Sequence, residues 1–99
     1  MNNINIIGRL GADAEVKQTE TNQIIKFSVA VDDGKDRPVI WFRCTKWITS
    51  GGSVKIADHI KKGDMIGVSG KVNLSEYNGK VSLEINVNNI TLCGGKMPF

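Results

Sequence analysis

Two tryptophans and an arginine recur at every second position of one short segment. Residues 39–48 alternate between two sets of side chains, which predicts a β-strand with two unlike faces. One set is Trp41, Arg43, Thr45 and Trp47, and the other is Ile40, Phe42 and Cys44. Because both faces cannot line one small core, we expect the tryptophan set to be exposed. An exposed pair of tryptophans usually marks a contact surface.

The chemistry of this face suits a flat, negatively charged ligand. Indole rings stack on nucleobases, and a guanidinium group pairs with phosphate. The sequence therefore indicates a surface for single-stranded nucleic acid around Trp41, Arg43 and Trp47. A second interpretation stays open, in which the same face packs on another subunit or beneath the 32–38 loop.

Further side chains are expected beside the tryptophans. Tyr77 lies in a hairpin loop at residues 75–79, signalled by Asn78-Gly79, where its ring either stacks on a ligand or folds over its own hairpin. Lys62 lies in the last turn of a short predicted helix, where it either contacts the ligand or complements the helix dipole. A polar and basic lining is expected from outward positions on the neighbouring strands, namely Lys26, Lys71, Asn73 and Lys80.

Groups that could perform catalysis are scarce. His59 is the single histidine and lies beside Asp58 in the predicted helix. The segment 50–53 contains glycines, but no lysine follows at the spacing of a phosphate-binding loop. The acidic turn at residues 32–36 is typical of a solvated loop rather than a cation site. We therefore expect no catalytic residues, no metal site and no cofactor, and we predict that the protein is not an enzyme.

Size and composition set further limits. A chain of 99 residues with 40% hydrophobic content forms one domain. Its formal net charge of +3 is compatible with a polyanionic partner. The N-terminus lacks the pattern of a signal peptide, and no segment is long and apolar enough to span a membrane. Two cysteines are too few for a disulfide framework, so we expect both Cys44 and Cys93 to be buried in a cytoplasmic protein.

Period-two patterns dominate the rest of the chain and predict an all-β fold with one short helix over residues 53–62. The expected strands cover residues 5–10, 25–31, 39–48, 66–74 and 81–87. Five strands with a helix between the third and fourth is the arrangement of an OB-fold, a five-stranded Greek-key barrel. A change of phase at Asn88-Asn89 indicates a β-bulge. Glycines within the predicted strands allow the tight curvature of a small barrel, and they are Gly8, Gly67 and Gly70.

Several motifs occur in the order found in the bacterial single-stranded-DNA-binding protein (SSB) family, which the chain resembles from about Asn3 to Gly94. The motifs are Gly8–Lys17, Lys26–Val31, Ile40–Trp47, Ala57–Asp64, Gly70–Val72 and Tyr77–Gly79. The resemblance implies an OB-fold that binds and protects single-stranded DNA in replication, recombination or repair, without sequence preference. It also implies a homotetramer in which the first strand helps to form a dimer interface.

The resemblance also assigns roles to residues. It assigns base stacking to Trp41, Trp47 and Tyr77. It assigns contacts with the DNA backbone to Arg43, Lys62 and Lys71 or Asn73. The expected binding domain covers residues 1–94 and is followed by a short tip at 95–99.

The sequence departs from the family pattern in several places, among them Ala14 where proline is usual and a short hairpin at residues 75–79. The 32–38 loop is short and lacks a tryptophan, and Glu76 stands where a basic residue is common. No acidic run precedes Met97-Pro98-Phe99, so the resemblance gives no support for recruiting replication enzymes through this tip. Two alternatives stay open. One is a dimeric OB-fold primosomal (PriB-like) accessory protein, and the other is a protein-interaction module whose tryptophans form a subunit contact.

Overall fold

Alternating side chains account for most of the observed strands. The computed structural model describes residues 1–93 apart from residues 33, 35 and 50–51. Its elements are β1 (Ile4–Leu10), β2 (Glu15–Gln18), β3 (Gln23–Val31), β4 (Ile40–Ile48), the 3₁₀-helix η1 (Lys55–His59), β5 (Met65–Tyr77) and β6 (Lys80–Leu92).

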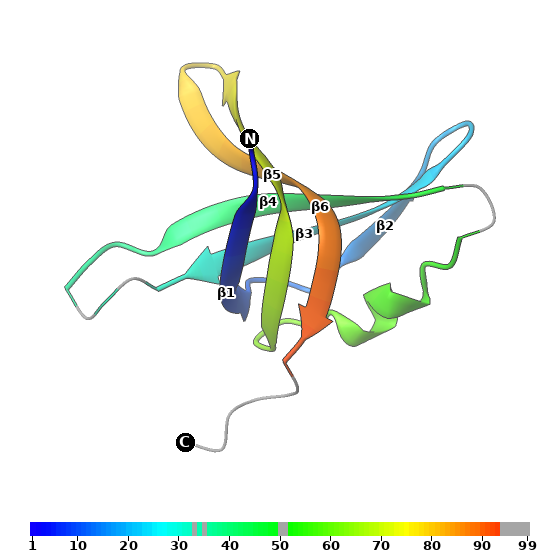
Figure 1. Ribbon diagram of the computed structural model, residues 1–99, viewed down its shortest axis with the longest axis horizontal. Helices are drawn as coiled ribbons and strands as arrows, with labels where there is room; N and C mark the ends of the chain where they lie inside the picture. The colour runs from blue at the N-terminus through cyan, green and yellow to red at the C-terminus, as the bar shows by residue number, and fades with distance from the viewer. Residues whose placement is uncertain (33, 35, 50–51, 94–99) are drawn as a thin grey trace.

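The strands close into a barrel (Figure 1). β1 pairs with β5 on one side and with β3 on the other, so the ring runs in the order β1-β5-β6-β4-β3. β4 and β6 run parallel, whereas the other paired strands of the ring run antiparallel. Apart from β2, the strands are the five predicted ones in the same chain order. The helix η1 lies between β4 and β5, which are the third and fourth of these five strands, as in an OB-fold. The predicted fold class is therefore confirmed.

One face of each barrel strand fills the interior. Alternation along β3 places Phe27 and Val29 inside, and alternation along β4 does the same for Phe42 and Cys44. Burying such a side chain stabilises the fold by roughly 1.5–3 kcal/mol. The buried cluster consists of Leu10, Ile25, Phe27, Val29, Phe42, Cys44, Ala57, Ile60, Ile66, Val68, Ile85 and Val87.

Strand β2 was not predicted from the sequence. All four of its residues are exposed, so they show no alternation between apolar and polar side chains. The strand pairs along the edge of β3, from Glu15 opposite Lys26 to Gln18 opposite Gln23. A turn at residues 19–22, closed by the Thr19 side chain and the Asn22 backbone, joins the two strands.

The predicted helix is a five-residue 3₁₀-helix rather than a longer amphipathic helix. Its apolar contacts, Val54, Ala57 and Ile60, are spaced by three residues, which matches the period of a 3₁₀-helix. Val54 is the residue that precedes the first turn, and Ser53 Oγ accepts a hydrogen bond from the Lys55 N–H at 3.1 Å. No helical segment among the described residues has the length and apolar character required to cross a membrane.

The hairpin between β5 and β6 is tighter than predicted. The strands continue until Tyr77 pairs with Lys80, so the loop contains only Asn78 and Gly79. Both loop residues have positive φ, 52° and 78°, as a type I′ turn requires. The turn end of the ribbon projects clear of the barrel (Figure 1). The predicted bulge is confirmed in β6, because Ser69 pairs with Asn89 and Gly70 with Val87, which leaves Asn88 unpaired.

Two of the three predicted strand glycines are required by close backbone approach. A Cβ atom at Gly70 would collide with the Asn86 carbonyl oxygen, and one at Gly8 would collide with the Ala30 carbonyl oxygen. At Gly67 the nearest atom to such a Cβ is the Thr91 Cβ at 3.5 Å, an ordinary contact. The barrel therefore needs glycine at positions 8 and 70 but has room for a methyl group at position 67.

We expect Gly70→Ala to lower the free energy of unfolding by about 1–3 kcal/mol, because the new methyl group pushes apart two backbones at the bulge. Gly67→Ala is the matched control on the same strand and should change the free energy little. Urea unfolding at one protein concentration measures both values. Equal effects of the two substitutions would contradict the assignment of Gly70 to backbone packing.

The two cysteines differ in environment. Cys44 is buried, as predicted, and burial raises the pKa of its thiol from 9.0 to about 12. Cys93 is exposed, so the prediction that it is buried was wrong. The reason is its position, because Cys93 follows the last residue of β6, and no later strand among the described residues covers it.

The raised pKa of Cys44 predicts a loss of stability in alkaline solution. The unfolded thiol ionises near pH 9.0 and the folded thiol near pH 12, so its contribution is intact below pH 9 and falls as the pH rises toward 12. Between pH 9 and 11 we expect the free energy of unfolding to fall by roughly 2–3 kcal/mol from this group. Urea unfolding of the protein and of Cys44→Val across this range measures the effect. An identical pH dependence in the two proteins would contradict the prediction.

Candidate nucleic-acid interface

Strand register places most of the predicted binding residues on one side of the sheet. Residues directly opposite each other on paired strands project from the same face. Thr45 of β4 pairs with Lys26 of β3 and with Asn86 of β6, and Asn86 pairs in turn with Lys71 of β5. Alternation along each strand then extends this surface, which we call the tryptophan face. Its predicted members are Lys26, Trp41, Arg43, Thr45, Trp47, Lys71, Asn73, Tyr77 and Lys80.

Both tryptophans are accessible. Trp41 and Trp47 each keep 53% of their surface exposed, and neither ring enters the barrel core. Trp47 lies opposite Ile24, whose side chain is buried on this outer side of β3. Trp41 lies against the backbone of Gly11, at the end of β1. Both indoles thus lie outside the core with aromatic surface free, as the alternation predicted.

A polar hollow of about 290 Å³ lies beside the middle of β4. It contains equal numbers of cationic and acidic side chains, so its charges largely cancel. Among the described residues, none of its carboxylates forms an ion pair with Arg43. Its lining residues are Ala12, Asp13, Glu15, Lys17, Lys26, Phe27, Ser28, Arg43, Cys44, Thr45 and Glu84. Attraction for a polyanion on this face must therefore come in part from cations outside the hollow.

The β5–β6 ribbon supplies such cations and a third aromatic ring. Tyr77 is 78% exposed, which does not fit a ring folded over its own hairpin. Lys80 lies directly opposite it, and Lys71 is exposed on the same side of β5. Asn73 is exposed between Lys71 and Tyr77 along β5, and it lies opposite Glu84 of β6. The ribbon therefore extends the tryptophan face beyond the barrel.

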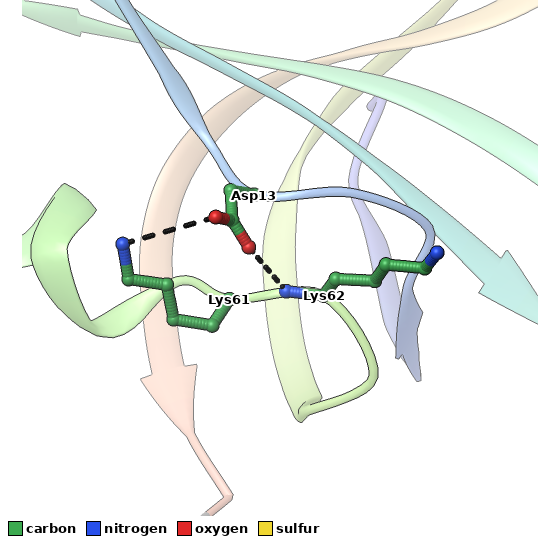
Figure 2. A network of polar contacts seen from close by, with 3 residues as sticks. All are labelled: Asp13, Lys61 and Lys62. Atoms are coloured by element: carbon green, nitrogen blue, oxygen red, sulfur yellow. Dashed lines mark hydrogen bonds and ion pairs between the residues drawn. The ribbon is translucent and has the colours of Figure 1, made fainter.

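Lys62 is the one predicted binding residue that does not share the tryptophan face through strand register. It lies in the loop after η1, where its backbone N–H donates to Asp13 Oδ1 at 2.9 Å (Figure 2). Lys61 Nζ lies 4.0 Å from Asp13 Oδ2, whereas the Lys62 side chain points away from Asp13. Because η1 ends at His59 and has only five residues, a helix-dipole role for Lys62 has little support.

Sequence reasoning missed four charged residues that line the hollow, namely Asp13, Glu15, Lys17 and Glu84. Glu15 and Lys17 lie on β2 and reach the hollow, but the strand itself was not predicted. The polar residues 19–22, which form the turn, precede the strand predicted at residues 25–31. They are the sequence signal that would have indicated a β2–β3 hairpin. Glu84 was assigned to the outward side of its strand, but its position opposite Arg43 depends on the parallel β4–β6 register, which the sequence does not reveal.

Comparisons with known proteins agree with this geometry. The description of the matching family model is "Single-strand binding protein family", and the match covers residues 1–93. Single-stranded DNA-binding protein 1 of Synechocystis sp. is 34% identical over 107 aligned positions, covering 97% of this chain and 86% of the relative. Single-stranded DNA-binding protein 3 of Streptococcus agalactiae is 28% identical, covering 91% of this chain and 68% of the relative.

A solved structure supports the fold. The second single-stranded-DNA-binding protein of Mycobacterium smegmatis superposes with a TM-score of 0.74, covering 93% of this chain and 88% of that chain. Its sequence identity of 17% makes this likeness one of fold alone. The barrel, the family match over nearly the whole chain and the 34% identical relative lead to one conclusion: the chain belongs to the single-strand binding protein family.

Proposed function

We propose that this protein binds single-stranded DNA without sequence preference, by stacking bases and neutralising phosphates. The observation that carries the proposal is the pair of half-exposed indoles, Trp41 and Trp47, on either side of Arg43 on one strand face. Stacking is assigned to Trp41, Trp47 and Tyr77. Contacts with phosphates are assigned to Arg43, Lys26, Lys62, Lys71, Asn73 and Lys80.

The proposed mechanism is stoichiometric rather than catalytic. Every base has an aromatic face, so stacking tolerates any sequence, whereas the bases of a duplex are not available to stack. Cationic side chains that neutralise phosphates release counterions and add affinity that depends on salt. Glu15 and Glu84 offset part of this charge, which leaves stacking as the larger contribution near the hollow.

Assembly of several subunits would strengthen the binding. We propose a homotetramer, because linked sites raise the effective concentration of each further contact. Ile7 of β1 is 62% exposed on the outer side of its strand, an apolar surface suited to the proposed β1 dimer interface. A cytoplasmic protein serving replication, recombination or repair fits the DNA-binding names of the two relatives.

Native mass spectrometry with and without oligo-dT tests binding and assembly together. We expect a four-subunit species that takes up the oligonucleotide, and little uptake of a matched duplex. Absence of any oligonucleotide-bound species would overturn the proposal. A dimer that instead captures a replication-restart helicase would favour the primosomal alternative. Loss of assembly without loss of DNA affinity on changing Trp41 or Trp47 would favour a subunit contact.

A further inference from the structure

The position of the Trp41 ring depends on a residue outside its own strand. Gly11 follows β1, and a Cβ atom built on it would lie 2.6 Å from Cζ3 and 2.8 Å from Cη2 of Trp41. Such approaches are too short for real Cβ atoms, so the six-membered ring occupies the space that any other side chain at position 11 would need. The next nearest atom, at 3.9 Å, also belongs to Trp41. The ring is therefore the obstacle to a side chain at this position.

The segment that carries Gly11 is fixed at both ends. The Gly11 N–H donates to the Ser28 carbonyl oxygen at 3.2 Å, which holds the segment to β3. The Ala14 N–H donates to the Ile60 carbonyl oxygen at 2.9 Å. Asp13 Oδ1 accepts from the Lys62 N–H, which ties the segment to the loop after η1 (Figure 2). Residues 11–14 thus form a fixed backbone support whose first residue, Gly11, lies against the Trp41 ring.

We propose that Gly11 is a positioning residue for Trp41. Its bare backbone lets the indole rest on the support formed by residues 11–14, and this contact holds the ring in one orientation before a ligand arrives. A ring held in place gives up less side-chain freedom when a base stacks on it, so binding is stronger. This inference rests on the proposed DNA-binding function, and it adds that the function depends on the absence of a side chain at position 11. Asp13 contributes indirectly, because its hydrogen bond with the Lys62 N–H fixes the segment that carries Gly11.

A double-mutant cycle tests this role. We expect Gly11→Ala to weaken binding of labelled oligo-dT about three- to tenfold in the otherwise unchanged protein. The same substitution should have no effect when Trp41→Ala is also present, because the displaced ring is then absent. Fluorescence anisotropy measures the four affinities. An equal loss in both backgrounds, or no loss in either, would overturn the proposal.

A second readout needs no DNA. The chain has two tryptophans, so Trp47→Phe leaves Trp41 as the single indole. Adding Gly11→Ala to that variant should change the emission of Trp41 and its quenching by iodide, because the ring leaves its support. Unchanged emission and quenching would contradict the positioning role. If the unmodified protein fails to bind oligo-dT, the proposed function fails, while this readout still decides whether Gly11 positions the ring.

Asp13→Ala covers the case in which Gly11→Ala does not fold. This change removes the acceptor of the Lys62 N–H without touching the indole ring. It also removes one negative charge from the hollow, which favours DNA binding by the same factor in both backgrounds. Relative to its effect in the Trp41→Ala background, Asp13→Ala should therefore lower oligo-dT affinity when Trp41 is present, by a smaller factor than Gly11→Ala does. An effect of the same size in both backgrounds would show that the support acts on binding independently of Trp41, which contradicts the inference.

Discussion

Replacing Trp47 with alanine is expected to weaken binding of oligo-dT by about 1–3 kcal/mol, roughly 5- to 150-fold, a cost known for stacking in proteins of this class. The fold should survive, because the ring is half-exposed and lies outside the barrel core. The loss arises because one base loses its aromatic partner while the phosphate contacts remain. Fluorescence anisotropy of a labelled oligonucleotide measures the affinity, and urea unfolding checks the stability.

Two matched variants make this result specific. Trp47→Phe keeps an aromatic face and should retain most of the affinity. Val16→Ala removes an exposed apolar side chain on the opposite side of β2 and should leave affinity unchanged. If Trp47→Ala leaves DNA affinity intact but changes the subunit number, the tryptophan face is a contact between subunits and the stacking role is wrong.

Removing two cations from the tryptophan face is expected to lower both affinity and salt dependence. Each phosphate contact on a single strand contributes about 0.7 to the slope of log K against log salt. The double variant Arg43→Gln with Lys71→Gln should therefore reduce the slope by about 1.4 per subunit. The affinity loss should be largest at low salt and small at high salt, because counterion release then contributes less.

The control for this experiment is a lysine away from the tryptophan face. Lys55 is exposed in η1, and Lys55→Gln removes one positive charge without altering the proposed path of the DNA. Its slope should equal that of the unmodified protein. If Lys55→Gln lowers the slope as much per charge as the double variant does, general attraction rather than contact with this face accounts for the binding.

Much of the tryptophan face could be predicted from the sequence, because side chains at every second position of a strand share one face. The alternation at residues 39–48 separated Trp41 from Phe42 without any knowledge of neighbouring strands. The Asn78-Gly79 turn and the change of phase at Asn88 likewise depend on local chemistry, and both were located correctly.

The rest depends on contacts between distant parts of the chain. The position of Glu84 opposite Arg43 is set by a parallel register that no local pattern encodes. Lys62 lies in a loop, where alternation assigns no face. Cys93 resembles a buried small residue by type, but its exposure follows from its place beyond β6. The contact of Gly11 with Trp41 joins two residues thirty positions apart, so the sequence gives no sign of it.

Tryptophan emission during titration with oligo-dT tests the central proposal most directly, because both indoles of the chain lie on the tryptophan face. Stacked bases should quench the emission strongly and saturably, while a matched duplex at the same concentration should quench it little. Emission that stays undiminished at saturating single-stranded DNA, or equal affinity for the duplex, would contradict the account.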